Sequence, residues 1–506
     1  MPSSIADPKV VMFAYKIEGD DLDRMTVNSE TAVTDGKETE LHRVIGPKLL
    51  LFLIMGDIIG AGIFAITGKV AGQVGGAAWL PFLIAFTIAT LTAFSYLELV
   101  TKYPHAAGAA LYIHKAFGIH FVTFLVAFTV ACSGITSAAT SATLVGRNLL
   151  IGIGQFVEGV PNTPEAGMWA AIAIIVILAI INFRGVGESV KFNLVLTIVS
   201  LAIMAAIIGI GLSVIASGHG DISRLVVFET PNDRSIFAAV TMGTAIAFFA
   251  MVGFEDSVNL VEETKDPKKT FPRIMLISLG ICAAIYMLVA VTVIMVIPTG
   301  DLLNPKNPDA GILLDVVRIG LPGLPVDAIF PFLTVFAVVN TALMNMLMAS
   351  RLLYGMARQG VLPQFLGKVH STRRSPWAAI LFSTVLAVAL VAYVNLDKEN
   401  SIVGSLGGTT ALLLLCVFAV VNVALLVLRR DKPEPGAFRT PTIIPILGVG
   451  FCLFLAGPWA RSREDWIQYE IAGLLLVIGV ALWAVTWLIN RINYKKGVIE
   501  TRPGQY

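Results

Sequence analysis

Twelve apolar segments follow one another along the chain, and they restrict its fold more than any other feature. A helix needs about 20 apolar residues, at 1.5 Å each, to cross the hydrocarbon core of a bilayer. Within lipid every backbone N–H and C=O has to be bonded internally, which favours helices. We therefore predict an all-α membrane protein with twelve transmembrane helices. The predicted spans are residues 48–67, 77–100, 119–151, 168–183, 192–216, 235–262, 274–297, 326–350, 377–394, 402–428, 442–460 and 467–490.

Composition excludes several classes of function. Charged residues make up 14% of the chain, against about 25% in soluble proteins. The formal net charge of +2 gives no basic field for a nucleic acid, so no nucleic-acid partner is expected. The four cysteines and six histidines lack the spacing of a metal site, and no phosphate-binding loop motif occurs. We expect no catalytic residues, no metal, no cofactor and no direct use of ATP, so the chain is not predicted to be an enzyme.

The distribution of basic residues predicts the topology. The first 45 residues are polar, without an early apolar stretch, which indicates a disordered cytoplasmic tail and not a signal peptide. With that tail inside, 27 of the 36 lysines and arginines lie on the cytoplasmic side. Both termini are then cytoplasmic, and the cell membrane is the expected location. The predicted units are a tail (1–45), a ten-span core (46–430), two further spans (431–491) and a C-terminal tail (492–506).

Two spans carry glycines and charges in their middle. The first contains the run from Gly56 to Phe64, with three glycines in seven residues, and the sixth contains the run from Phe248 to Asp256. Glycine weakens a helix, and an opened backbone in a membrane has to line a cavity or the protein interior. Interruptions at corresponding places in two halves point to the substrate site of a transporter. The alternative interpretation is that these glycines only allow neighbouring helices to pack closely.

Such breaks would suit an α-amino acid. A helix that restarts near Gly62 offers free N–H groups and the positive end of its dipole to a carboxylate. A half-helix that ends near Val252 offers carbonyls to an ammonium group, and Phe249, Met251 and Val252 would shape the pocket for the side chain. The predicted substrate-binding residues are Ile59, Gly60, Ala61, Gly62, Ile63, Phe249, Ala250, Met251, Val252 and Gly253.

Ionisable residues at membrane depth are candidates for coupling. Glu255 lies beside the second break and can alternate between charged and neutral forms, or can hydrogen-bond the unwound backbone. Asp256 could share its role or turn to a polar loop, and Asp57 could bind a proton or cation or cap the broken helix. Glu98, near a span end, is expected to form an interfacial salt bridge. The four-residue spacing of three serines predicts a small-residue packing seam at Ser133, Ser137 and Ser141. Polar side chains in the eighth span could hold a cation or hydrogen-bond a neighbouring helix, namely those of Asn340, Thr341 and Asn345.

Several motifs resemble those of the amino acid–polyamine–organocation superfamily of permeases. The matching stretches occur in order over residues 45–490: 56–64, 96–99, 103–104 with Gly108, 182–186, 253–255, 262–267 with Pro272, and 350–363. The resemblance implies the leucine-transporter-type (LeuT-type) fold, a 5+5 inverted repeat with broken helices 1 and 6. It also implies uptake of amino acids or related amines by alternating access.

Carried over by position, the resemblance places the substrate carboxylate at Ala61, Gly62 and Ile63, and the ammonium group at carbonyls around Phe249 and Val252. Phe249 takes the place of an aromatic gate, and Glu255 takes the acidic position after Gly-Phe. Ser200 stands where some proton-coupled relatives carry a lysine, and Asp57 adds a charge that relatives often lack.

The leading prediction is a secondary active amino acid symporter, with the proton preferred over sodium as the coupling ion. One alternative is a cationic amino acid or polyamine transporter or exchanger. Another is a sodium-coupled symporter with its ion near Ser200 and Asn340. An alternative of a different class is a transport-inactive amino acid sensor of the same fold.

Overall fold

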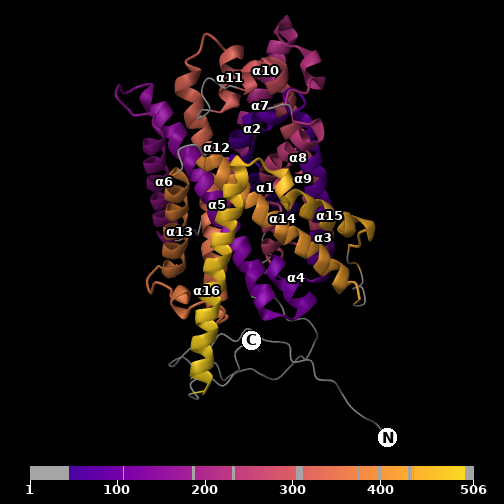
Figure 1. Ribbon diagram of the computed structural model, residues 1–506, viewed down its shortest axis with the longest axis vertical. Coiled ribbons are helices and arrows are strands. Elements are labelled where there is room, and N and C mark those ends of the chain that lie inside the picture. Colours follow the sequence, from indigo (N-terminus) through magenta and orange to yellow (C-terminus); the bar gives the residue numbers. More distant parts are fainter. Residues whose placement is uncertain are drawn as a thin grey trace.

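The protein is a bundle of helices that lie mostly along its long axis (Figure 1). The structure, a computed structural model, describes residues 45–105, 108–184, 189–230, 234–303, 311–373, 375–396, 401–430, 436 and 438–495. Over these residues it contains helices, turns and two isolated backbone bridges, and no strand longer than one bridge. The all-α prediction is confirmed.

The helices form in chain order where the apolar segments predict them, with short helices in between. Their bounds are α1 Pro47–Ile58, α2 Ala61–Val74, α3 Trp79–Lys102, α4 Gly108–Phe117, α5 His120–Gly154, α6 Pro164–Arg184, α7 Ser189–Val214, α8 Ile236–Ala247, α9 Pro267–Val296, α10 Thr299–Leu303, α11 Ile312–Gly320, α12 Val326–Arg358, α13 Trp377–Leu396, α14 Ile402–Leu428, α15 Ile443–Ala456 and α16 Ile467–Lys495. Shorter helical turns are η1 Ile215–His219, η2 Ile222–Val226, η4 Phe248–Met251, η5 Asp256–Leu260, η6 Gln364–Gly367, η7 Pro458–Ala460 and η8 Glu464–Trp466.

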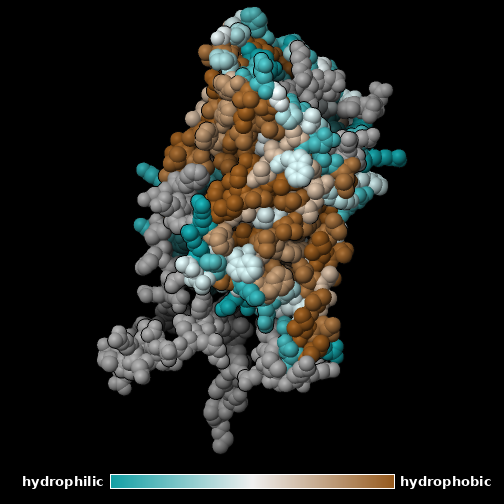
Figure 2. Space-filling model, turned by 90° about the vertical axis from the view of Figure 1, so that its left-hand side faces the viewer, coloured by the Kyte–Doolittle hydropathy of each residue, from teal (hydrophilic) through white to brown (hydrophobic). Residues whose placement is uncertain are grey.

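An apolar surface covers much of the middle of the bundle on the face that Figure 2 shows, where brown residues lie between teal residues at the top and teal patches lower down. Within the described residues, ten helices are long and apolar enough to cross a bilayer, or eleven if the bent pair α1 and α2 is one span. Each predicted span overlaps a helix, but α15 has only 14 residues. At 1.5 Å per residue it is shorter than the hydrocarbon core, so the count of twelve stays a prediction.

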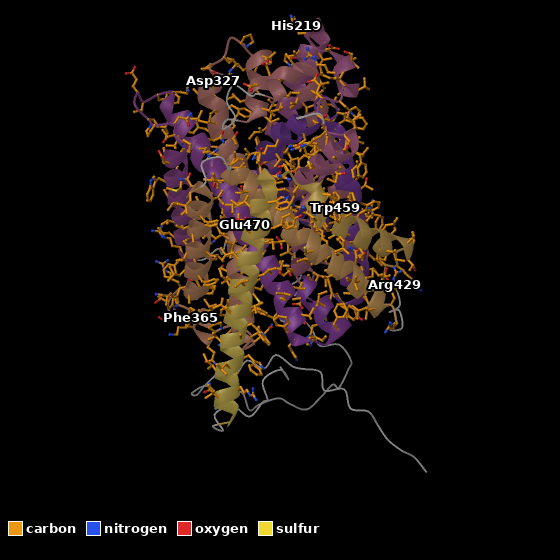
Figure 3. The ribbon with its side chains drawn as sticks, viewed as in Figure 1. His219, Asp327, Phe365, Arg429, Trp459 and Glu470 are labelled. Atoms are coloured by element: carbon orange, nitrogen blue, oxygen red, sulfur yellow. The ribbon has the colours of Figure 1, made fainter. Side chains whose placement is uncertain are left out.

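The labelled side chains in Figure 3 show the direction of the chain through the bundle. His219 and Asp327 lie at the upper end, and Phe365 lies toward the lower end. Helix α12 therefore descends through the whole bundle, from near Asp327 to just before Phe365. The short helices α10 and α11 lie near the upper end and α4 near the lower end (Figure 1). These three were not among the predicted spans, since they are too short to cross a membrane.

Helix α5 runs through the centre and packs mainly against α12 and α14. Small residues make this close packing possible. Ser133, Ser137 and Ser141 are all buried on α5, as a packing seam requires. One turn along, the Thr136 hydroxyl is 2.7 Å from that of Thr410 on α14, so a polar contact also joins the two helices.

An ion pair fastens α3 to the end of α14. Arg429 donates from Nε to Glu98 Oε1 at 2.9 Å and from Nη2 to Glu98 Oε2 at 2.6 Å. The Thr440 N–H donates to the same carboxylate at 2.8 Å, and Lys102 Nζ donates to the Leu428 carbonyl at 2.6 Å. The two-pronged geometry, the burial of Glu98 and the partial burial of Arg429 make this pair stronger than a surface one. The predicted salt bridge of Glu98 is confirmed.

We expect Arg429→Gln to destabilise the folded protein by about 3 kcal/mol, because it leaves the carboxylate of Glu98 buried without its partner. The measurement is the thermal unfolding midpoint of the purified protein in detergent. Arg430→Gln is the matched control, since Arg430 is the exposed neighbour. Equal midpoints for the two variants would contradict the prediction.

Candidate functional site

The first interruption lies between α1 and α2. Helix α1 ends at Ile58, α2 begins at Ala61, and their axes are bent by 44°. The N–H of Ile59 still donates to the Met55 carbonyl at 2.7 Å, and the hydroxyl of buried Tyr286 on α9 donates to the Ile58 carbonyl at 2.7 Å. Both of these groups beside the break are therefore satisfied within the protein.

The second interruption follows α8. After Ala247 the chain tightens into the 3₁₀ turn η4 and then becomes extended at Val252, with φ −80° and ψ 150°. Gly253 has φ +123°, a conformation that side chains rarely allow. A second 3₁₀ turn, η5, begins at Asp256. The carbonyls of this stretch are thus not part of a regular α-helical ladder.

The two interruptions touch through their backbones. A Cβ atom added to Gly62 would lie 2.6 Å from the Cα atom of Ala250. One added to Gly253 would lie 2.9 Å from the carbonyl carbon of Asp57 and 3.1 Å from the nitrogen of Ile58. Real Cβ atoms do not approach so closely, so glycine at both positions allows the contact. The two glycine-containing runs therefore lie against each other at these positions.

A pocket lies beside the second interruption, between it and α5, α12 and α14. Three predicted site residues line it, namely Val252, Glu255 and Asp256. The other lining residues are Val130, Ser133, Gly134, Asn345, Met348, Ala349, Leu352, Thr410 and Leu414. On descending α12, the lining begins at Asn345, one turn after Thr341. Among the described lining residues there are two carboxylates and no lysine, arginine or histidine.

Glu255 holds the backbone of the second interruption. Its Oε2 atom accepts a hydrogen bond from the Gly253 N–H at 2.9 Å, and the residue is only 7% exposed. Asp57 lies against Gly253, since a Cβ atom on Gly253 would be 2.9 Å from the Asp57 carbonyl carbon. One acidic residue of the first run and two of the second, Glu255 and Asp256, therefore lie on the segments that meet at the junction of the two interruptions.

Most of the other predicted binding residues are buried behind the pocket and do not line it. Ile59, Ala61, Ile63, Ala250 and Met251 are each at most 1% exposed. The ring of Phe249 packs on α14, where a Cβ atom on Gly407 would lie 3.4 Å from two of its carbons. Gly60 and Gly62 are also buried at the first interruption.

An aromatic cluster anchors the second interruption. Phe254 packs at 5.9 Å from Tyr96 on α3 and 5.3 Å from Phe418 on α14, measured between ring centroids. Phe248 packs against the same Phe418 at 6.0 Å. Large buried rings before and after Val252 thus fix the irregular segment from both sides, since their burial and edge contacts favour one arrangement.

A second polar group lies where α7 and α12 pass the first interruption. The Ser200 hydroxyl donates to the Leu196 carbonyl at 3.0 Å and approaches the Ala337 carbonyl at 3.5 Å. Asn340 Oδ1 and Thr341 Oγ1 are buried with no hydrogen-bond partner among the described residues. Thr341 Oγ1 touches Gly60 so closely that no Cβ atom fits there. Ser200 and Asn340, predicted as one alternative ion site, therefore lie on neighbouring helices.

Sequence reasoning missed most of the pocket wall. Val130, Gly134, Met348 and Leu352 belong to long apolar helices and look like any other packing residues. Ser133 was predicted as part of a seam, yet it also lines the pocket. A signal that could have found this wall is the polar pair Asn345 and Thr410 within apolar runs, which becomes specific only once α12 and α14 are placed.

Comparison with known proteins then shows what these helices form. Residues 45–482 match the model of a family described as amino acid permease. The chain belongs to the amino acid permease family. It is thus a multi-pass membrane protein of amino-acid transport, which implies a small amino acid substrate and a lipid bilayer as its surroundings.

Known permease relatives differ in the substrates that their names state. The chain is 28% identical to the methylthioribose transporter of Bacillus subtilis (strain 168) and 26% identical to its branched-chain amino acid permease BcaP, each over 91% of this chain and 96% of the relative. It is 26% identical to the vacuolar cationic amino acid transporter 4 of Arabidopsis thaliana, over 81% of this chain and 67% of the relative.

We expect Gly253→Ala to abolish substrate uptake by this permease, because a side chain strains the positive φ and pushes the Asp57 carbonyl away. Gly280→Ala on α9 is the control, since a Cβ atom there meets nothing within 4 Å. Uptake of labelled amino acids into proteoliposomes measures the difference. Normal uptake by the Gly253 variant would show that the contact between the two interruptions is dispensable.

Proposed function

We propose that this permease is a secondary active amino acid symporter that works by alternating access and is driven by the proton gradient. The observation that carries the proposal is the buried carboxylate of Glu255, which lines the pocket and accepts the Gly253 N–H at 2.9 Å. A titratable group at membrane depth is costly and marks an ion or proton path. Here it is bonded to the backbone of the interruption itself.

The proposed substrate site uses the open ends of the half-helices. The N-terminus of α2, at Ala61, Gly62 and Ile63, presents N–H groups and a positive dipole end for the substrate carboxylate. The carbonyls from Phe249 to Val252 would accept hydrogen bonds from the ammonium group. Gly62 and Ala250 now pack against each other, so binding requires these two segments to separate. Motion at the interruptions is therefore part of the proposed cycle.

Proton coupling follows from the double role of Glu255. As a carboxylate, Glu255 accepts the hydrogen bond from Gly253, whereas a protonated carboxyl group is a weaker acceptor. Taking up a proton would therefore loosen Gly253 from Glu255. Because Gly253 also packs on the Asp57 carbonyl, the change reaches the first interruption directly. Asp57 and Asp256 would also contribute to the negative charge of the site, and so to its binding of a proton.

The orientation is proposed from the distribution of charge. The basic residues that we assign to the cytoplasm include those at the lower ends of α3, α12 and α14, for example Lys102, Arg358 and Arg429. The lower end in Figure 1 would then face the cytoplasm, with the protein in the cell membrane. Because the pocket residues of α12 follow Thr341 toward that end, the pocket lies on the proposed cytoplasmic side of the interruptions.

A substrate with a second positive charge is the first alternative. Two carboxylates and no basic residue line the described pocket, which favours a cationic amino acid or a polyamine over an acidic one. One relative is named a cationic amino acid transporter, while others are named for branched-chain amino acids. Competition of unlabelled lysine, leucine and spermidine against labelled uptake separates the two classes.

Sodium coupling is the second alternative, and one observation favours it. Asn340 Oδ1 and Thr341 Oγ1 are buried without a partner, and Thr341 lies directly beside Gly60. Oxygen atoms of this kind are ligands for hard cations. Ser200, on the adjacent helix α7, would complete the site. A transport-inactive sensor of the same fold is a third alternative, which counterflow of labelled amino acid would exclude.

We expect Glu255→Gln to lose accumulation driven by an inward proton gradient while it keeps substrate exchange, because glutamine can bond Gly253 but cannot release a proton. Proteoliposomes with an imposed pH gradient measure the first activity, and counterflow measures the second. Glu470→Gln is the control, since Glu470 is exposed on α16 (Figure 3). Unchanged accumulation in the Glu255 variant would rule out its coupling role.

The sodium alternative predicts a different result. If sodium binds beside the first interruption, uptake by the unmodified permease should depend on sodium, and Thr341→Val should raise the sodium concentration needed for half-maximal uptake. Valine keeps the shape of threonine and removes only the oxygen ligand. Sodium titration of uptake at constant ionic strength measures the shift. Uptake that is equal in sodium and in choline would contradict this alternative.

A further inference from the structure

The lower part of α16 carries a stack of two aromatic rings that ends in a cation. Trp483, Trp487 and Arg491 follow one another at intervals of four residues, so they lie on one face of the helix. The rings of Trp483 and Trp487 are stacked with their centroids 6.4 Å apart. The guanidinium carbon of Arg491 lies 5.1 Å from the centroid of the Trp487 ring. The cation is therefore held beside an aromatic face.

Two neighbouring segments hold this part of α16 in place. The ring of Phe121, at the start of α5, meets the Trp483 ring edge-on, with the centroids 4.8 Å apart. Asn490 is 5% exposed, and its Nδ2 atom donates to the Gly360 carbonyl, just after α12, at 2.9 Å. The stack therefore belongs to the folded bundle and not to a free helix end.

The end of the stack faces outward, and its charge is not neutralised by the protein. Trp487 is 36% exposed, and Arg491 beside it is exposed. Helix α16 has no acidic residue after Glu470. Within the described part of the chain, no ion pair includes Arg491. An exposed guanidinium group without a carboxylate partner is suited to an anion from outside the chain.

The stack lies at the end of a surface that faces lipid. Figure 3 places Glu470 about halfway down the bundle, and α16 descends from there to the lower end. Trp487 is 17 residues further along, which is about 25 Å at the rise of an α-helix. Tryptophan is typical of the boundary between membrane and water. The apolar side chains around it are 43–53% exposed, namely those of Val485, Leu488, Ile489 and Ile492.

We propose that Trp487 and Arg491 bind the headgroup of an anionic phospholipid in the leaflet at the lower end of the bundle. The guanidinium group donates hydrogen bonds to two phosphate oxygens, and the Trp487 ring keeps it oriented. The acyl chains lie along the exposed apolar side chains of α16. The bound lipid thereby stabilises the contacts of α16 with α5 and with the segment after α12.

A second copy of this chain fits the same surface less well. In a two-fold symmetric pair the same face meets itself, so Arg491 would lie near another Arg491 with no carboxylate from the described part of α16 between them. A lipid phosphate supplies the missing negative charge, and its acyl chains match the apolar neighbours. The inference does not depend on the proposed transport mechanism.

The test measures the thermal unfolding midpoint of the full-length permease in detergent micelles as phosphatidylglycerol is added. Phosphatidylcholine is the comparison lipid without net charge, and glycerol phosphate is the soluble source of the same phosphate group. Arg491→Gln removes the cation, and Trp487→Leu removes the ring but keeps an apolar side chain. Arg463→Gln is the matched control, because Arg463 is an exposed arginine just before η8, at the other end of α16.

We expect phosphatidylglycerol to raise the midpoints of the unmodified protein and of Arg463→Gln alike. Arg491→Gln should need about tenfold more of this lipid for half of the rise, because it loses hydrogen bonds to a charged group. Trp487→Leu should also need more, since its guanidinium group is no longer held by a ring. Glycerol phosphate at the same concentration should leave the midpoint unchanged, because it has no acyl chains.

Several outcomes would overturn the inference. One is the same dependence on phosphatidylglycerol in Arg491→Gln and Arg463→Gln, and another is an equal rise with phosphatidylcholine. A rise with glycerol phosphate would indicate a site for soluble anions. A smaller oligomer in Arg491→Gln with unchanged lipid dependence would show that a second copy covers the stack. Because the midpoint is measured without transport, failure of the proposed function would not alter these results.

Arg491→Lys keeps the test decisive if Arg491→Gln folds poorly. Lysine retains the positive charge but lacks the planar group that pairs with two phosphate oxygens. The lysine variant should therefore need an amount of phosphatidylglycerol between those of the unmodified protein and of Trp487→Leu with Arg491→Gln combined. A lysine variant that needs as much lipid as this double variant would contradict a role of the charge.

Discussion

Every polar backbone group within a bilayer needs a partner, and this requirement governs how the two spans can be interrupted. In the described structure several backbone groups beside the interruptions already have partners within the protein. The Ile58 carbonyl is bonded by Tyr286, the Ile59 N–H by Met55, and the Gly253 N–H by Glu255. The N–H groups that begin α2 and the carbonyls around η4 are the remaining candidates for a ligand. The bonds within the protein therefore define which part of each interruption is available to substrate.

Close backbone contact adds a second condition. Gly62 against Ala250, and Gly253 against Asp57, leave no room for a side chain. These contacts bring the start of α2 and the end of α8 into one place, while Phe248 and Phe254 fix the irregular segment between α3 and α14. The residues that leave the α-helical pattern thus lie between well-packed aromatic anchors. A transporter needs this combination, because its site must rearrange without loosening the bundle.

The sequence predicted the helices and the place of the interruptions, but not the walls around them. Each hydropathy-predicted span overlaps a helix because lipid-facing and core-facing residues are both apolar, and the pairing of glycine with Asp57 and Glu255 marked the irregular stretches. Because almost all residues of these helices are apolar, the sequence does not distinguish pocket residues such as Val130 and Met348. Their role depends on which other helices pack against α5 and α12. The partner of Glu98 stands 331 residues away. Long-range placement was the missing information in each case.

Glu255 connects the proposed binding of a proton to the backbone geometry of the site. A carboxylate that only bound a proton could lie anywhere on a path through the membrane, and one that only capped the interruption could be replaced by an amide. Glu255 accepts the Gly253 N–H, and Gly253 in turn rests on Asp57 in the first interruption. A change of charge on one side chain therefore alters a hydrogen bond at the junction of the two interruptions. Because Val252, Glu255 and Asp256 also line the pocket, that change occurs in the segment that faces α5, α12 and α14.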